Sequence, residues 1–248
     1  MMIVGLIPAR YASVRFPAKP LARLAGRPMV VHVLEAARGA RRLDRVLVAT
    51  DDERIARVVR AAGGEAILTS AQAASGTDRL AEAARSVPAD IYVNIQGDEP
   101  LMSSENIDSA IATLLSSPGR QIATLATALA PDEAADPNVV KIAVARDGRA
   151  LYFSRAAIPY PRQGAAVYRK HLGLYVYRAA ILQEIAALPP SPLEQKESLE
   201  QLRWLESGYA IWVGDAATDS IGVDTPEDLA RVEKMIETRT GVRKETVS

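Results

Sequence analysis

Short apolar runs alternate with helix-forming segments through the first half of the chain. The expected strands are 3–7, 45–50, 66–68 and 91–95, and the expected helices are 28–38, 51–62, 77–86 and 103–115. Strands that are apolar throughout are covered on both faces, which is typical of parallel sheets joined by crossover helices. The alternation therefore predicts an α/β fold, in which ligands bind at the carboxyl ends of the strands.

The second half of the chain predicts antiparallel pairing. Asp147-Gly148 separates two apolar runs and favours a tight hairpin turn. The expected strands here are 139–144, 150–153, 171–177, 210–213 and 221–223, and the expected helices are 179–188, 196–207 and one that begins at 226. No stretch has the composition of a flexible linker. We therefore expect one domain over residues 1–248, whose mixed sheet is interrupted by an antiparallel subdomain at about 131–168, a candidate dimerisation surface.

The composition excludes several classes of function. The 248 residues include 30 basic and 30 acidic side chains, so no net positive charge favours nucleic acid or a membrane surface. No run approaches the ~20 apolar residues of a membrane helix, and the N-terminus lacks a signal-peptide pattern. The absence of cysteine excludes disulfides, thiolate catalysis and cysteine-bound zinc. We expect a cytoplasmic protein whose anion-binding site, if present, is local.

A cationic loop follows the first strand. Arg10, Arg15 and Lys19 lie on a segment that prolines stiffen. The phosphate-binding motif GxxxxGK[ST] is absent, so side chains must supply charge that backbone N–H groups supply in such loops. Each cation alone fits a solvated surface loop equally well. Together, two bidentate arginines and a lysine can converge on a triphosphate, and the loop predicts a nucleotide site.

Two aspartates occupy matching places after strands. Asp98 follows the strand at 91–95, and the preceding Gly97 allows close approach of the backbone to a ligand. Asp224 follows a short strand and precedes a helix. Either acid, or Glu99, can instead cap the next turn or helix, although Thr225 is already available to cap the last helix. If their strands are neighbours, the two aspartates predict a Mg²⁺ site.

Other candidates are less specific. Ser75-Gly76 precedes a helix, where the serine caps by default but its hydroxyl can also contact a base. His171 begins a tyrosine-rich strand, although a lone histidine is more often structural, as we expect of His32. Residues 199–203 have an ordinary helical pattern, and spacing alone predicts that they face solvent.

In combination, these segments resemble the 3-deoxy-manno-octulosonate cytidylyltransferases. The matching segments occur in the family's order and cover nearly the whole chain, which makes the set specific. They are IPARYASVRFPAKPL from Ile7, SGTDRLAE from Ser75, VNIQGDEP from Val93, LYFSRAAIPY from Leu151, KHLGLYVYR from Lys170, SPLEQKESLEQLRWLESGYAI from Ser191 and GVDTPEDLARV from Gly222. The clearest departure is the segment between Pro161 and His171, which is shorter than in some members.

The resemblance implies a glycosyltransferase-A-like α/β fold with a mixed, mainly parallel sheet and an inserted antiparallel subdomain, usually in a homodimer. It implies that CTP and an acidic eight-carbon sugar, 3-deoxy-D-manno-octulosonate (KDO), give a CMP-sugar and pyrophosphate for lipopolysaccharide synthesis, with Mg²⁺ as cofactor.

The resemblance also implies roles for individual residues. Those implied for the nucleotide are Pro8, Ala9, Arg10, Arg15, Lys19, Ser75, Gly76 and Gly97. Those implied for the sugar acid are Gln96, Arg155, His171, Tyr175, Glu200 and Gln201. Asp98 and Asp224 would hold the metal, and with Arg10, Arg15 and Lys19 they form the expected catalytic set.

Two alternatives stay open. One is a related transferase for 8-amino-KDO, a sialic-type acid or a hexose phosphate, the last of which predicts clustered cations for a second phosphate. Instead, Arg155 is accompanied by His171, Glu200 and Gln201, a mixture that suits a polyhydroxy carboxylate. The other is a non-catalytic nucleotide-binding relative, against which stands the presence of every charged group that the chemistry requires.

Overall fold

The computed structural model describes residues 1–12, 16–73, 75–165 and 167–240, with side chains as far as residue 238. Within these residues, nine strands form one sheet in the order β11-β7-β10-β6-β1-β4-β5, and β8 and β9 join it through β10. These strands are β1 Ile3–Ala9, β4 Arg45–Thr50, β5 Glu65–Leu68, β6 Ile91–Asn94, β7 Ile122–Leu129, β8 Lys141–Val144, β9 Ala150–Ser154, β10 Tyr168–Arg178 and β11 Ile211–Asp215.

The sheet is mixed and mainly parallel in its first half. β1 lies between β4 and β6 and is parallel to both, and β5 continues this set beside β4. β10 is antiparallel to both β6 and β7, and it thereby joins the parallel half to the rest of the sheet. The α/β fold predicted from the alternating pattern is confirmed.

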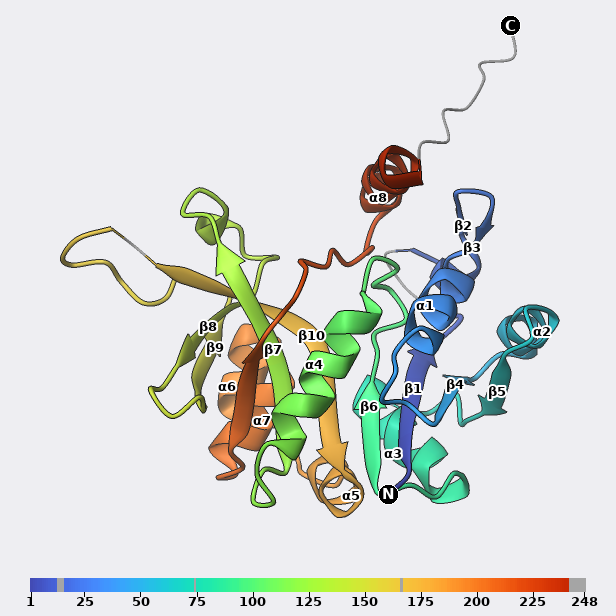
Figure 1. The fold of residues 1–248 in the computed structure, drawn as a ribbon, viewed down its shortest axis with the longest axis horizontal. Coiled ribbons are helices and arrows are strands. Elements are labelled where there is room, and N and C mark those ends of the chain that lie inside the picture. The colour runs from blue at the N-terminus through green and yellow to red at the C-terminus, as the bar shows by residue number, and fades with distance from the viewer. Residues whose placement is uncertain (13–15, 74, 166, 241–248) are drawn as a thin grey trace, which may run out of the picture.

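Helices cover both faces of the sheet (Figure 1). They are α1 Met29–Arg38, α2 Glu53–Ala61, α3 Gly76–Ser86, α4 Ser104–Leu115, α5 Ala179–Ala186, α6 Pro192–Glu197, α7 Gln201–Glu206 and α8 Pro226–Thr240. One buried cluster packs α1, α2 and α4 against the sheet, and a second packs α3, α5 and α7 against the opposite face. This double cover explains why the parallel strands are apolar at consecutive positions.

Small elements complete the edge where β1 ends. The hairpin of β2 Arg23–Leu24 and β3 Arg27–Pro28 follows the short 3₁₀ helix η1, Lys19–Leu21. α8 packs against this hairpin in a small third cluster and lies at the top of Figure 1. A second 3₁₀ helix, η2 Glu133–Ala135, precedes β8.

Two expected elements differ from the structure, and one strand was not expected. Residues 221–223 form no strand, and a backbone bond from Val223 N–H to the carbonyl oxygen of Asp98, at 2.8 Å, joins this segment to the loop after β6. The expected helix at 196–207 is two helices, because Ser198 has a left-handed backbone (φ 52°) that ends α6. β7, central to the second half of the sheet, was not among the expected strands.

The antiparallel hairpin around Asp147-Gly148 is present as β8 and β9. It pairs with β10 between Lys141 and Lys170, so it extends the main sheet. Its role in dimerisation, and residues 131–168 as a subdomain boundary, stay predictions. In the part of the chain that the structure describes, no helix has the length and apolar character needed to cross a membrane.

Candidate active site

Two adjoining clefts lie where the parallel strands end. The first encloses about 330 Å³ between the loop after β1, the start of α3 and the loop after β6. The second encloses about 890 Å³ and is lined by β10, the residues around α7 and the segment before α8. Gln96, Asp98 and Asp224 line both clefts. Ligands bound in the two clefts would therefore meet beside the two aspartates.

The residues predicted to bind the nucleotide line one cleft, and those predicted to bind the sugar acid line the other. Those expected to bind nucleotide and described by the structure all line the first cleft: Pro8, Ala9, Arg10, Lys19, Ser75, Gly76 and Gly97. Those expected to bind the sugar acid all line the second: Gln96, Arg155, His171, Tyr175, Glu200 and Gln201. Arg15 lies outside the described residues. Their contacts with ligands stay predictions.

Gly97 allows the ends of β1 and β6 to approach each other closely. A Cβ atom on this residue would lie 2.5 Å from the carbonyl oxygen of Pro8, which is closer than real Cβ contacts allow. The neighbouring main chains that line the first cleft can therefore keep this spacing only with glycine. The sequence pointed to Gly97 for close approach to a ligand, and the structure adds a close approach to another strand end.

Lys19 lies between the two aspartates. Its Nζ is 2.7 Å from Oδ2 of Asp98 and 3.0 Å from Oδ1 of Asp224. The bond from Val223 N–H to the Asp98 carbonyl oxygen brings the segment before α8 to this place. The two acids are neighbours, but the stated condition that their strands be neighbours is not met, because residues 221–223 form no strand and loops bring the acids together.

The donor set suits Mg²⁺. Both carboxylates already contact one cationic group, so a second small cation can take the same position. The described residues contain no group of three or more His, Cys, Asp or Glu side chains placed to hold a metal. Mg²⁺ commonly binds through one or two carboxylates, with phosphate oxygens and water as its other ligands. Asp98 and Asp224 therefore fit this ion.

The start of α8 positions Asp224. The N–H of Thr225 donates to Oδ2 of Asp228 at 2.9 Å, and the N–H of Asp228 donates to Oγ1 of Thr225 at 3.2 Å. The capping role expected of Thr225 is confirmed, and the bonds with Asp228 make the cap reciprocal. Oδ2 of Asp228 also accepts from the N–H of Asp224 at 3.0 Å, so the cap fixes the backbone of the metal-ligand candidate as well.

The start of α3 forms the opposite wall of the first cleft. The Ser75 hydroxyl accepts from the N–H of Asp78 at 3.1 Å, and the Asp78 carboxylate accepts from the N–H of Ser75 at 3.0 Å. The default capping role of Ser75 is confirmed. One turn further, Arg79 lines the cleft and is 3 % exposed.

A buried ion pair joins three strand-end loops beneath the first cleft. Nη2 of Arg79 lies 3.1 Å from Oδ2 of Asp51, which follows β4. The other carboxylate oxygen of Asp51 accepts from the N–H of Tyr11, after β1, at 3.1 Å. Nη1 of Arg79 donates to Oγ1 of Thr69, after β5, at 2.5 Å. Sequence reasoning missed this pair, since its members are 28 residues apart and no local motif joins them.

Main-chain carbonyl groups orient Arg155 in the second cleft. Its Nε donates to the carbonyl oxygen of Glu197 at 2.7 Å, and its Nη1 donates to that of Pro137 at 2.8 Å. The buried Lys141 in turn donates from Nζ to the carbonyl oxygen of Arg155 at 2.5 Å. Carbonyl oxygens are uncharged, so these bonds fix the guanidinium without cancelling its charge, and that charge suits a carboxylate ligand.

His171 is buried and packed among aromatic side chains. Its Nε2 lies 3.0 Å from Oγ1 of Thr124, and its ring contacts Phe153 edge to face. Burial lowers the pKa of His171 to about 3. Tyr175 lies beside it, with a ring-centroid separation of 5.3 Å. His171 is therefore a neutral group in the wall of the second cleft, and His32, bonded through Nε2 to the Leu24 carbonyl oxygen at 2.7 Å, is structural as predicted.

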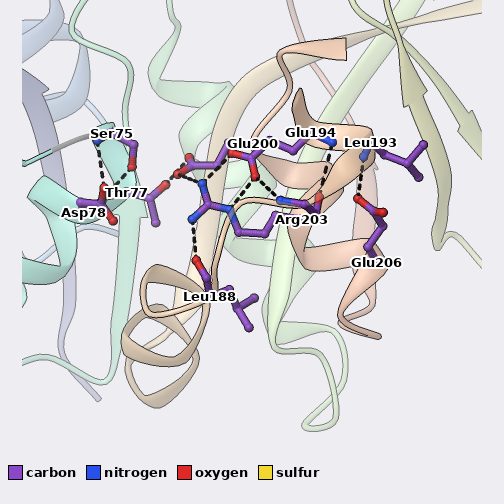
Figure 2. Close-up of polar contacts among 10 residues, drawn as sticks. Ser75, Thr77, Asp78, Leu188, Leu193, Glu194, Glu200, Arg203 and Glu206 are labelled. Atoms are coloured by element: carbon purple, nitrogen blue, oxygen red, sulfur yellow. Dashed lines mark hydrogen bonds and ion pairs between the residues drawn. The ribbon is translucent and has the colours of Figure 1, made fainter. Parts of the chain in front are cut away.

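The start of α7 and the two residues before it show that the prediction from helical spacing was wrong. Leu199, Gln201 and Leu202 are buried, so residues 199–203 do not form a solvent-facing stripe. Figure 2 shows Glu200 between α3 and Arg203, and its Oε2 accepts from the hydroxyl of Thr77 at 2.6 Å. Burial raises the pKa of Glu200, and the bond from Thr77 partly offsets this effect. The resemblance had indicated a site position for Glu200 and Gln201 that helical spacing missed.

Other polar residues in the second cleft were also missed. Glu99, expected at most to cap a turn, is half-buried, and desolvation raises the pKa of its carboxyl group to about 7. Lys170 donates from Nζ to Oδ1 of Asp219 and to the carbonyl oxygen of Ser220, both at 2.8 Å. Only the tertiary structure brings β10 to the loop before α8, and no spacing in the sequence signals this pair.

Comparisons with known proteins agree with this geometry. The family model described as "Cytidylyltransferase" matches residues 4–211. A 3-deoxy-manno-octulosonate cytidylyltransferase from Syntrophobacter fumaroxidans is 54% identical over 242 residues, covering 94% of this chain and 96% of the relative. One from Acidobacterium capsulatum is 50% identical over 236 residues, with 94% and 96% covered.

Solved structures show the same architecture. The structure of a CMP:2-keto-3-deoxy-manno-octonic acid synthetase complexed with CTP superposes with a TM-score of 0.93 at 44% identity, covering 96% of this chain and 100% of that chain. A cytidylyltransferase from Leptospira borgpetersenii shares the fold, with a TM-score of 0.62 at 17% identity, and 100% and 99% of the two chains covered. On these matches over nearly its full length, the chain belongs to the 3-deoxy-manno-octulosonate cytidylyltransferase family.

Proposed function

We propose that this protein transfers CMP from CTP to KDO and releases pyrophosphate. The observation that carries the proposal is the pair of clefts that meet at Asp98 and Asp224. The first cleft has the cations and close main chains that suit a nucleotide, and the second has the mixed polar groups that suit a sugar acid. Relatives named for this reaction, and a solved neighbour complexed with CTP, support the assignment.

The chemistry needs no nucleophile from the protein. The anomeric oxygen of the sugar forms a bond to the α-phosphorus as the bond to pyrophosphate breaks in line. Positioning and charge neutralisation dominate such transfers. Arg10 and Lys19 line the first cleft and would offset the charge of the phosphates. Arg155 would orient the sugar carboxylate from the second cleft.

We propose Mg²⁺ as the cofactor, with Asp98 and Asp224 as its protein ligands. The cation would neutralise phosphate charge and lower the pKa of the attacking hydroxyl. The position of both carboxylates around one Nζ supports this assignment. Removal of divalent cations with a chelator should stop pyrophosphate release, and excess Mg²⁺ should restore it.

The acceptor is a sugar acid in this proposal. Lys170, which lines the second cleft together with Arg155, is already paired with Asp219, and Glu200 and Glu99 add acidic groups. A second phosphate would meet these acids, so the hexose-phosphate alternative is disfavoured. KDO and 8-amino-KDO differ at one substituent, and the assignment of KDO follows the names of the relatives.

One experiment tests donor, acceptor and catalytic competence together. Pyrophosphate release should be measured with each of the four ribonucleoside triphosphates against KDO, 8-amino-KDO, a sialic acid and a hexose phosphate. We expect release with CTP and KDO above every other pair. No release with any pair would favour a non-catalytic relative, and a preference for another acceptor would overturn the KDO assignment.

The homodimer and the cytoplasmic location stay predictions. Leu151 on β9 and the nearby Tyr160 and Val167 are large apolar side chains with 63%, 84% and 77% exposure, which is consistent with a partner surface on this part of the chain. Sedimentation equilibrium should give twice the 26.6 kDa mass of the chain, and Leu151→Asp should shift the population towards monomer.

A further inference from the structure

We propose that Lys19 is a positioning residue that occupies the cation site between Asp98 and Asp224 until a divalent cation displaces it. Its ammonium group then moves to the nucleotide phosphates. Only this second step rests on the proposed function; competition between the lysine and the metal follows from the contacts of Lys19 with the two carboxylates.

The contacts of Lys19 place it at the metal position and not at a phosphate position. Nζ is within hydrogen-bond distance of both carboxylates, at 2.7 Å from Asp98 and 3.0 Å from Asp224. The lysine side chain is 14% exposed, compared with 34% and 46% for the two acids. One ammonium charge offsets part of the repulsion between two carboxylates and keeps them facing each other. A metal ion that binds these same two carboxylate oxygens must therefore replace Nζ.

The local backbone allows the exchange by side-chain rotation alone. Lys19 begins η1, where its N–H donates to the carbonyl oxygen of Phe16 at 3.2 Å and its carbonyl oxygen accepts from the N–H of Ala22 at 3.1 Å. The lysine also lines the first cleft, beside Arg10. Its flexible four-carbon stem lets Nζ leave the acids while the backbone stays fixed. The cleft that receives a triphosphate is thus within reach of the displaced ammonium group.

The exchange couples metal binding to nucleotide binding. Without nucleotide, a metal ion must compete with Lys19 for its ligands, so its affinity is reduced. With CTP present, the phosphates offer the ammonium group a new partner, and this cost disappears. Linkage requires that the metal then strengthens CTP binding by the same factor. The protein would bind the metal together with nucleotide in preference to the metal alone.

The test measures metal affinity and not turnover. Mn²⁺ binding to the wild-type protein, Lys19→Met, Lys19→Arg and Arg10→Met would be followed by electron paramagnetic resonance without nucleotide and again with CTP. We expect Lys19→Met to bind Mn²⁺ alone about tenfold more tightly than wild type, within the range usual for coupled sites. Lys19→Arg keeps a cation between the acids and should remain close to wild type.

Arg10→Met is the matched control, because Arg10 lines the same cleft but has no ion pair with either acid among the described contacts. It should change Mn²⁺ affinity by less than about threefold. CTP should also strengthen Mn²⁺ binding by a smaller factor in Lys19→Met than in wild type. Equal or weaker Mn²⁺ binding by Lys19→Met would overturn the proposal, as would an equal gain in Arg10→Met.

A check of folding and a substitute variant keep the test decisive. Circular dichroism would establish that each variant is folded, and Lys19→Gln would replace Lys19→Met if that variant were not. The nucleotide-free titration needs no substrate, so a failed pyrophosphate assay would not affect its outcome. Conversely, an active enzyme whose Lys19→Met variant gains no metal affinity would refute the exchange and leave the proposed reaction intact.

Discussion

Asp98 combines two roles that a single substitution can separate. Its carboxylate contacts Lys19 and faces both clefts, while its main-chain oxygen accepts a bond from the N–H of Val223. Asn keeps the size of the side chain and leaves the main-chain bond unchanged. The substitution therefore removes mainly the charge.

We expect Asp98→Asn to lower CMP transfer by about a hundredfold or more, since charge stabilisation dominates such transfers. The free energy of unfolding should change by less than about 1 kcal/mol, because the Lys19 ion pair is partly exposed. Initial rates at saturating Mg²⁺ and denaturant titrations would measure the two effects. Near-normal turnover would contradict the assignment of Asp98 as a metal ligand.

His171 gives the protein a specific sensitivity to acid. Its pKa is lowered by burial to about 3, from an ordinary value of 6.5. The unfolded chain binds a proton as the pH falls below 6.5, whereas the folded chain does so only near pH 3. Stability from this group is therefore present above pH 6.5 and is lost as the pH falls between the two values.

Between roughly pH 6 and 4, the free energy of unfolding should fall about 1.4 kcal/mol per pH unit because of this residue. His171→Gln should remove that contribution and give a shallower dependence on pH. Denaturant titrations of both proteins at each pH would measure the slopes. Equal slopes would mean that His171 is protonated in the folded state.

At the residue scale, functional side chains close to the end of a strand could be predicted from the sequence. The positions of buried side chains far from a strand end could not. Asp98 could be placed because it lies in the short loop after an apolar strand. Glu200 could not be placed by spacing, since its position depends on the break at Ser198 and on the hydroxyl of Thr77, 123 residues away in the chain. Only the resemblance of the whole segment indicated its place in the site.

At the scale of elements, contact between strand ends determines the shape of the first cleft. Gly97→Ala would place Cβ 2.5 Å from the carbonyl oxygen of Pro8, so the loop after β6 must shift away from the end of β1. We expect a loss of about 1–3 kcal/mol in the free energy of unfolding and a higher KM for CTP. Gly119→Ala, where nothing lies within 4 Å of the added Cβ, is the matched control. Equal effects of the two substitutions would exclude a role for this close approach.

The buried pair of Asp51 and Arg79 joins elements that the sequence keeps apart. Asp51→Ala would leave the Arg79 guanidinium, 3% exposed, without its acidic partner. We expect a loss of about 3–5 kcal/mol in the free energy of unfolding. Glu35→Ala removes the exposed partner of Arg27 and should cost less than about 1 kcal/mol. Similar losses in the two variants, measured by urea denaturation, would contradict this explanation.

Helices and strands whose bounds are marked by residues in their own sequence were predicted closely. Strands that depend on which other strands lie beside them were not. β4 has the predicted bounds, because continuous apolar residues are bounded by a capping aspartate. Residues 221–223 have a similar apolar appearance, yet no strand among the described residues lies beside them to complete a ladder. β7 has the continuous apolar pattern, but its place between β10 and β11 depends on pairing across the sheet.

At the scale of the whole molecule, one sheet connects the two clefts. β6 ends at the first cleft and pairs with β10, whose middle residues line the second. Both tryptophans, Trp204 on α7 and Trp212 on β11, lie in the second half of the chain and outside the lining of the first cleft. Tryptophan fluorescence therefore reports unfolding at a distance from the expected CTP site.

If the sheet unfolds as one unit, CTP must stabilise the region around the tryptophans as much as the region that it contacts. With Mg²⁺ and CTP at about 100 times its Kd, stability should rise by about 2.7 kcal/mol. For a domain of this size, that gain corresponds to a Tm increase of about 5–10 °C. Fluorescence and far-ultraviolet circular dichroism should show a single coincident transition with and without ligand. A CTP-dependent shift seen by circular dichroism alone would instead divide the chain into two units, and would contradict the single domain expected from its sequence.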